Sequence, residues 1–159
     1  MATLPQLIEE DIQALDKLLC EFLSHSDATT VLIVDKGGFL ITHQGNAAEF
    51  DLTTISALAS GAYLANQTIA NLIQEENFSN VYQQGEKFSL LATNVDENCL
   101  LLVIFRATIG VGVVKFWATK MRDHIGQQLQ LAHERDPGAG LDLSVLNLAD
   151  TSSVFKRKT

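Results

Sequence analysis

The stretch from Leu52 to Gln74 contains no Lys, Arg, Asp or Glu, although these residues make up 19% of the chain. Its Ala-, Leu- and Ile-rich composition predicts a helix, and Asp51 precedes it as an N-cap whose carboxylate accepts from free backbone N–H groups. A surface helix normally has one apolar stripe and one charged face. Because this helix has no charged face, we expect one side to pack on the core and the other on another chain.

A helical wheel with about 100° per residue divides this predicted helix into two faces. Leu and Ile gather on one face, which we expect to pack on the sheet: Ile55, Leu58, Ala62, Ala65, Ile69, Leu72 and Ile73. The opposite face is small, polar and neutral, which suits a protein partner: Thr53, Ser56, Ser60, Tyr63, Leu64, Gln67 and Asn71.

Periodicity predicts the elements around this helix. In residues 5–23, apolar side chains recur at steps of four and three, typical of one helix face, with Pro5 in the first turn. Two β-rich runs, 30–34 and 39–42, flank Asp35-Lys36-Gly37-Gly38 and predict a β-hairpin. Three further runs at 78–85, 87–95 and 99–105 predict an antiparallel meander. Its continuously apolar part, Leu100–Phe105, predicts a central strand buried on both faces.

Residues 109–133 contain a β-branched first part, which propensity alone would make a strand. Val113, Trp117, Met121, Ile125 and Leu129 keep a helical four-residue step across the whole segment, so we predict one long helix. The predicted fold over residues 1–135 is therefore α+β, in the order α-β-β-α-β-β-β-α, with a five-stranded antiparallel sheet. A partly apolar tail, 136–159, is either disordered, docked on a partner or folded back on the sheet.

The net charge and the cysteine content limit which classes of partner and which cellular compartment the chain suits. The net charge of −8 and the isoelectric point of about 4.8 argue against nucleic acid or an anionic membrane as the main partner. The uncharged stretch contains too many Ser, Thr, Asn and Gln residues to span a membrane. Cys20 and Cys99 are expected to be small buried thiols, and the acidic N-terminus does not resemble a signal peptide. We expect a cytoplasmic protein.

Sequence motifs that carry chemistry are absent. There is no P-loop, no GxGxxG and no GxSxG, and the four histidines lack metal-ligand spacing. We therefore expect that the protein has no active site of its own and binds no metal and no cofactor. Three classes of function stay open: a regulator of another protein, a scaffold, and a small-molecule sensor, for which no convergent polar set marks a pocket.

Taken in order, "VLIVDKGGFLI", "ISALASGAYLANQTIANLIQE", "FSNVYQQGEKFSLL" and "CLLLVIF" resemble the Roadblock (dynein light chain 7) family, and most closely its bacterial MglB members. The resemblance covers residues 8–133 and implies the fold predicted above. It also implies a homodimer that pairs the second helix and the third strand. MglB-like proteins act on a Ras-like GTPase of the MglA type in bacterial cell polarity or motility. They accelerate GTP hydrolysis by reshaping the switch regions of that GTPase and need not supply an arginine finger.

By position, the resemblance assigns the GTPase contacts to the second helix: Ala57, Ser60, Gly61, Leu64, Gln67 and Thr68. It assigns the dimer contacts to that helix and the third strand: Tyr63, Asn71, Phe78, Val81 and Tyr82. We expect Ser60→Arg or Leu64→Arg to abolish GTPase binding and to leave the fold intact. The expected function is a homodimeric GTPase-activating or GTPase-binding protein. The alternative is a non-catalytic scaffold that assembles a complex containing the GTPase.

Overall fold

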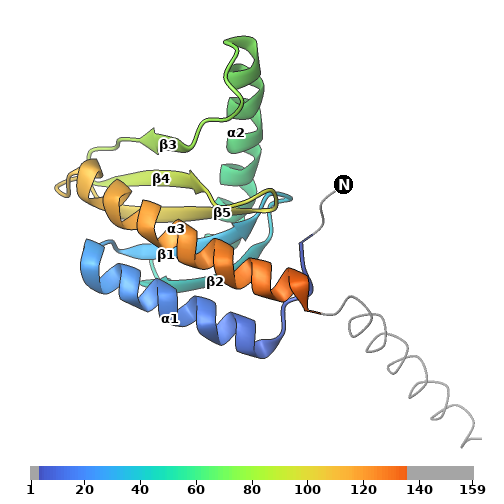
Figure 1. Cartoon of the computed structure of the whole chain (residues 1–159). Coiled ribbons are helices and arrows are strands. Elements are labelled where there is room, and N and C mark those ends of the chain that lie inside the picture. The colour runs from blue at the N-terminus through green and yellow to red at the C-terminus, as the bar shows by residue number, and fades with distance from the viewer. Residues whose placement is uncertain (1–3, 136–159) are drawn as a thin grey trace, which may run out of the picture.

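The computed structural model describes residues 4–135 (Figure 1). In chain order the elements are α1 Glu9–Ser26, β1 Thr30–Asp35, β2 Leu40–Gly45, α2 Leu52–Leu72, β3 Asn80–Gln83, β4 Phe88–Asn94, β5 Cys99–Arg106 and α3 Val111–Glu134. The strands form one antiparallel sheet in the order β2-β1-β5-β4-β3. The predicted α+β fold and its order of elements are confirmed. The predicted tail, 136–159, lies outside the described residues.

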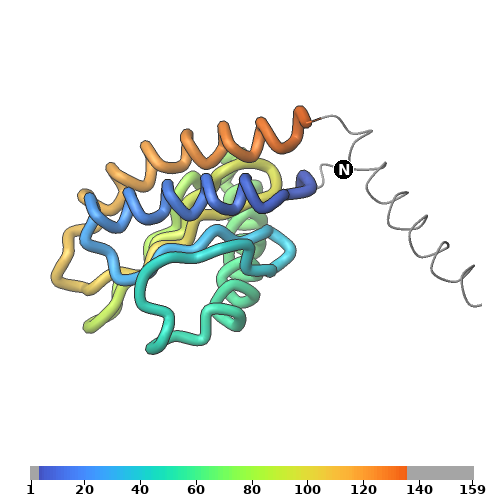
Figure 2. The backbone as a smooth tube through the Cα atoms, turned by 90° about the horizontal axis from the view of Figure 1, so that it is seen from below, coloured from blue at the N-terminus to red at the C-terminus, as the bar shows by residue number. Residues whose placement is uncertain are grey.

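Helices cover the two faces of the sheet unequally. α1 and α3 lie side by side on one face, and α2 lies alone on the other (Figures 1 and 2). The core under α1 and α3 contains Leu19, Phe22 and Ile125 packed against Val31 and Val103. A second core forms under α2, where a smaller set of side chains meets the other face of the same strands. The molecule is therefore a three-layer sandwich with one lightly covered face.

β5 is the central strand, as its apolar run predicts. Leu102 pairs with Leu32 of β1 on one side and with Ala92 of β4 on the other. Every residue from Cys99 to Phe105 is buried. A strand with helices over both faces has no solvent side, which explains why this run does not alternate between apolar and polar residues.

The first helix begins four residues later than predicted, and Pro5 lies outside it. The backbone N–H of Ile8 donates to Asp11 Oδ2 at 2.9 Å, which fixes the first turn at Glu9. The helix ends at Ser26, because the next residue, Asp27, has a left-handed conformation (φ 57°) that stops it. The hairpin is confirmed, although β2 begins at Leu40, so that Phe39 lies in the turn. Asp51 caps α2 as predicted, accepting from the backbone N–H of Thr54 at 3.1 Å.

The last segment is helical over its full length, as predicted, but its buried face is rotated at the start. The buried residues are Val114, Ala118, Met121, Ile125, Leu129 and Ala132, whereas Val113 is exposed.

The expectation that both cysteines are buried is correct for one of them. Cys99 is buried, and this burial raises the pKa of its thiol to about 12. Cys20 is exposed because it lies on the outer side of α1.

One buried carboxylate ties the start of α1 to the end of α3. Asp11 is 1% exposed and accepts from both terminal nitrogens of Arg135 at 2.8 Å. It also accepts from Gln128 Nε2 at 3.0 Å. The Arg135 guanidinium is the main reason that the pKa of Asp11 falls to about 2 from its usual 3.8. This pair holds the two helices of one layer in register.

Replacing Asp11 by Asn should lower the free energy of unfolding at neutral pH by about 2 kcal/mol, because a charge-assisted bidentate contact is lost. Since folding lowers the pKa of Asp11, its contribution is full above the unfolded pKa of about 4 and is lost as the pH falls toward about 2. The free energies of unfolding of wild type and Asp11→Asn, measured by urea denaturation, should therefore converge as the pH is lowered from about 4 toward about 2. Asp123→Asn is the matched control, because Asp123 is exposed and its contact with Arg122 is 3.7 Å long. If Asp123→Asn lowers the free energy of unfolding as much as Asp11→Asn does, the prediction is contradicted.

Candidate interaction surface

The side of α2 that packs on the sheet carries small polar residues and Tyr63, which reverses the prediction for most of the helix. Ile55 is the exception, because it lies on the predicted packing face and is half-buried in the core under α2. Leu52, Ser56, Ser60, Tyr63 and Ala70 are the buried residues of this helix. Ser56 Oγ donates to the backbone oxygen of Leu52 at 2.7 Å, and Ser60 Oγ donates to that of Asp35 at 3.2 Å. Because each hydroxyl has a backbone acceptor, burying these serines costs little, and their small size lets α2 approach the sheet closely.

Tyr63 is the one large side chain on the packed face. It is 2% exposed and packs with Leu32, Leu100 and Leu102 in the core under α2. Its hydroxyl donates to the backbone oxygen of Phe78 at 3.3 Å and accepts from Gln67 Nε2 at 3.2 Å. Burial also raises the pKa of the phenol. Ser60 and Tyr63, which the resemblance assigned to partner contacts, are thus inside the protomer, and Gln67 is half-buried.

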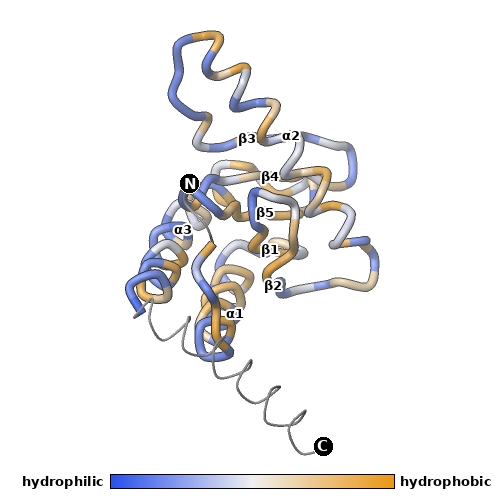
Figure 3. Tube along the Cα trace, turned by 90° about the vertical axis from the view of Figure 1, so that its right-hand side faces the viewer, coloured by the Kyte–Doolittle hydropathy of each residue, from blue (hydrophilic) through white to orange (hydrophobic). Residues whose placement is uncertain are grey.

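The apolar flank of α2 is exposed. It comprises Leu58, Ala62, Ala65, Ile69, Leu72 and Ile73, with exposed fractions of 68% for Leu58 and 79% for Leu72. This flank lies toward β3, since Ala62 and Asn66 line a small cleft together with Val81 and Gln83. The C-terminal part of α2 projects beyond the β3 edge of the sheet (Figures 1 and 3). Large aliphatic side chains are thus exposed on a projecting helix, where they form an apolar surface patch.

The second exposed flank of α2 is small and neutral and lies toward the β1–β2 turn. Ala57, Gly61, Leu64 and Thr68 are exposed on it, as the GTPase assignment requires of them. Gly38 has a φ of +105°, and a Cβ there would lie 3.3 Å from Ala57 Cα, so glycine lets the turn lie against the helix. Phe39 follows it and is 75% exposed. Phe39 was expected in the second strand of the hairpin and not as a surface residue, although a large aromatic residue directly after Gly37-Gly38 was the signal.

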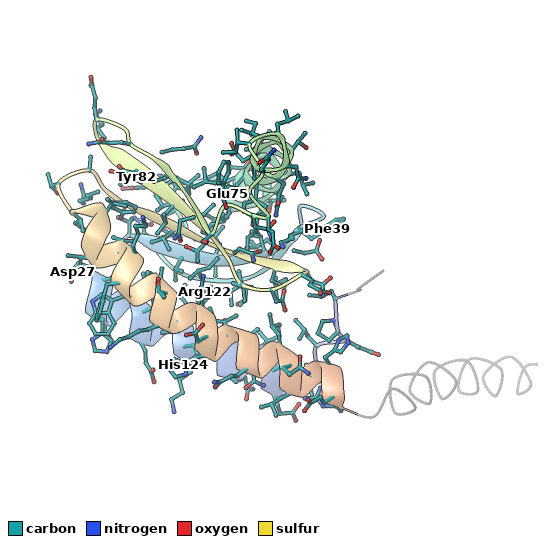
Figure 4. The ribbon with its side chains drawn as sticks, turned by 45° about the horizontal axis from the view of Figure 1, so that its top comes forward. Asp27, Phe39, Glu75, Tyr82, Arg122 and His124 are labelled. Atoms are coloured by element: carbon teal, nitrogen blue, oxygen red, sulfur yellow. The ribbon has the colours of Figure 1, made fainter. Side chains whose placement is uncertain are left out.

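The residues assigned to the dimer divide between the two faces of the sheet. Phe78 and Val81 are half-buried, with Val81 packed on the α2 side, and Asn71 is exposed at the end of α2. Tyr82 points to the opposite side, where its ring stacks on Phe105 at 6.1 Å (Figure 4). β3 pairs only with β4, so its outer edge has no neighbouring strand among the described residues.

An open apolar groove of about 360 Å³ lies on the α2 side of the sheet, between the start of α2 and the β3–β4 turn. Its lining residues are Phe50, Ile55, Gln83, Gln84, Gly85, Phe88, Ser89, Leu90 and Ile104. The rings of Phe50 and Phe88 meet edge to face at 5.3 Å. The groove exists because α2 alone does not cover this face of the sheet.

Among residues 4–135, no group of His, Cys, Asp and Glu is arranged to hold a metal ion. In that same part of the chain, no helix is both long and apolar enough to cross a membrane. The candidate site is the exposed surface built from α2, β3 and the β1–β2 turn.

Ser60→Arg should destabilise the fold, because Ser60 is 2% exposed and a guanidinium has no room there. This replaces the expectation that the fold stays intact. Leu64→Arg is the matched control, because the same new side chain stands in solvent on the next turn. Thermal unfolding should show a Tm far below wild type for Ser60→Arg alone. Equal melting temperatures for the two variants would contradict the packing of α2.

The Roadblock/LC7 domain model matches residues 14–105, which is more than half of the chain. Among solved structures, MglB from Myxococcus xanthus is 27% identical, with a TM-score of 0.76 over 82% of this chain and 98% of that chain. MglB from Thermus thermophilus, described as a gliding protein, is 24% identical, with a TM-score of 0.75 over 82% and 98%. An MglB with a tetrameric arrangement is 24% identical, with a TM-score of 0.77 over 83% and 99%. Among curated proteins, none matches the chain. The family match and the agreement of the fold with these structures show that the chain belongs to the Roadblock/LC7 domain family.

Proposed function

We propose that the protein is a homodimeric regulator of a small Ras-like GTPase of the MglA type, acting in bacterial cell polarity or motility. The observation that carries this proposal is the exposed surface of α2, which is free of charge from Leu52 to Gln74 and has two chemically different flanks. The similarity to MglB proteins supports the choice of partner. Roadblock/LC7 domains are generally not enzymes, so the role we infer is exerted on the GTPase.

The apolar flank of α2 suits a second copy of the chain. It lies toward the open edge of β3, and the projecting end of α2 carries Leu72 and Ile73 beyond that edge. If two β3 edges pair, each projecting helix end extends over the sheet of the other protomer. The apolar groove beside the β3–β4 turn then receives aliphatic side chains. Burying each such side chain contributes about 1.5–3 kcal/mol, enough for a few of them to hold a dimer.

The small neutral flank suits the GTPase. Ala57, Gly61, Leu64 and Thr68 are exposed there, and the neighbouring Phe39 supplies an aromatic anchor of the kind that dominates binding energy at interfaces. None of the exposed α2 side chains on this flank is charged, so covering the helix here desolvates no charge on α2 itself. The flank carries no arginine. We therefore infer that any activation comes from holding the switch regions of the GTPase in a reactive arrangement.

A scaffold function uses the same two flanks without a change in the rate of hydrolysis. The absence of any Lys, Arg, His, Asp or Glu on α2 favours this alternative, since the helix has no charged group that could act on a phosphate. The two functions are distinguished by one measurement, the rate of GTP hydrolysis in the presence of the protein.

Ile69→Arg should convert the protein to a monomer, because a charge would have to be buried among the aliphatic side chains of the second copy. Its mass in solution, measured by light scattering after size exclusion, should halve while its circular dichroism is unchanged. Thr53→Arg is the control, because Thr53 is exposed near the other end of the same helix and off the apolar flank. A wild-type monomer, or a dimer that survives Ile69→Arg, would overturn this assignment.

Leu64→Arg should abolish the effect on the GTPase without changing the dimer, because Leu64 lies on the neutral flank and is 51% exposed. GTP hydrolysis by the small GTPase encoded in the same genome should be accelerated by wild type and not by this variant. Phe39→Ala should weaken binding about tenfold or more as an anchor residue. Binding without acceleration would establish the scaffold instead. Wild-type protein that neither binds nor accelerates would refute both functions.

A further inference from the structure

On the side of the sheet opposite α2, the last turn of α1 and the first turns of α3 carry an aromatic cluster. The rings of His25 and Trp117 stack at 4.4 Å with an interplanar angle of 13°. Phe116 meets Trp117 edge to face at 5.1 Å. Phe116 is 52% exposed and Val113 is 50% exposed. With Lys120 these four residues form a surface that we call the α3 patch. Figure 4 shows the end of α1, marked by Asp27, beside the first turns of α3.

Lys120 adds a cation to these rings. Its Nζ lies 4.6 Å from the centre of the Phe116 ring and 5.2 Å from that of Trp117. Among residues 4–135, no carboxylate lies within ion-pair distance of Lys120 or of Lys115, which is exposed on the same turns. The rings hold the ammonium group in place, and its charge is not neutralised by a neighbour.

The charge around the patch differs in sign from that of the whole chain. Lys115 and Lys120 are the cations of the first turns of α3, and no Asp or Glu occurs from Asn98 to Arg122. Arg106 lies over the Phe88 ring and Arg122 contacts Asp123 at 3.7 Å, so neither adds an unpaired charge to the patch. The chain as a whole has a net charge of −8. Glu21 on α1 and Asp27, the C-cap residue of that helix, are the acidic residues nearest in sequence to His25, and neither pairs with Lys115 or Lys120. A local concentration of cations in an acidic protein attracts a compact anionic group.

We propose that the α3 patch binds an acidic peptide segment of a partner protein in which an apolar side chain is flanked by Asp or Glu. The apolar side chain covers Phe116 and Val113, and the flanking carboxylates reach Lys120 and Lys115. An anionic membrane or a nucleic acid requires a broader cationic surface than these few residues supply, and the overall charge of −8 repels both. A short segment meets only the local cations.

The proposal does not depend on the proposed regulation of a GTPase. The α3 patch and the flanks of α2 lie on opposite faces of the sheet (Figure 2). A second copy or a GTPase on α2 therefore leaves the patch open. The protein has two independent surfaces, and failure of binding at one would not affect the test of the other.

Trp117 is the only tryptophan of the chain, so its fluorescence reports directly on the patch. We would titrate the full chain with short synthetic peptides that carry Phe or Leu between Asp and Glu residues. Saturable changes in Trp117 emission that weaken with added salt are expected. The same peptides with Asn and Gln in place of Asp and Glu should bind about tenfold more weakly or not at all. Absence of any saturable change with the acidic peptides would overturn the proposal.

Phe116→Ala and Lys120→Glu should each reduce peptide affinity about tenfold or more, since each removes one half of the recognition. Lys17→Glu is the matched control, because it makes the same change of charge at an exposed position on the outer side of α1. An equal loss with Lys17→Glu would show unspecific attraction and contradict the proposal. Tight binding of phosphatidylserine vesicles would also contradict the proposal if it depends on Lys120, because the patch would then be a membrane-binding site. Unchanged circular dichroism of the variants separates lost binding from lost folding.

Discussion

The five-stranded sheet has two faces, and the three helices of the described chain cover them unequally. α1 and α3 together cover one face, where Leu19, Phe22 and Ile125 close the core. The other face has only α2, which is too narrow to cover five strands. As a result the groove beside the β3–β4 turn stays open, and the end of α2 projects past β3. This inequality leaves apolar surface on both the sheet and the helix, which is why we propose that a partner covers them.

The way α2 binds to the sheet sets what it offers outward. Ser56 and Ser60 satisfy their hydroxyls on backbone oxygens, so the helix can lie close to the strands through small polar residues and Tyr63. The aliphatic side chains of α2 therefore point away from the sheet and are exposed. A helix that buried its leucines in its own core would present the serines instead and would have little affinity for a second copy.

The opposite layer has a different chemistry. α1 and α3 are held in register by the Asp11–Arg135 pair at one end and by the His25–Trp117 stack at the other. The first end is internally neutralised, whereas the second leaves Lys120 without a carboxylate among the described residues. We therefore regard the molecule as having a neutral, apolar side for assembly and a smaller cationic, aromatic side for a further partner.

Much of the fold was predictable from residues alone, whereas the orientation of α2 was not. The continuously apolar run of β5 predicted a central strand, since a strand covered on both faces has no reason to alternate. The four-residue step from Val113 to Leu129 predicted α3 against its β-branched propensity, because apolar periodicity over many residues outweighs local preference. For α2, the wheel assigned the more apolar face to the sheet of its own protomer and the small polar face to another chain, and this prediction was wrong. Only the packed structure shows that Ser60 and Tyr63 are inside while Leu58 and Leu72 are outside. The place of the β1–β2 turn against α2 and the stacking of His25 on Trp117 were also decided by tertiary structure, because each joins segments that are distant in the sequence. The sequence by itself determined which elements form and that α2 has no charged side; the close approach of the chain to itself decided which side of α2 is left for a partner.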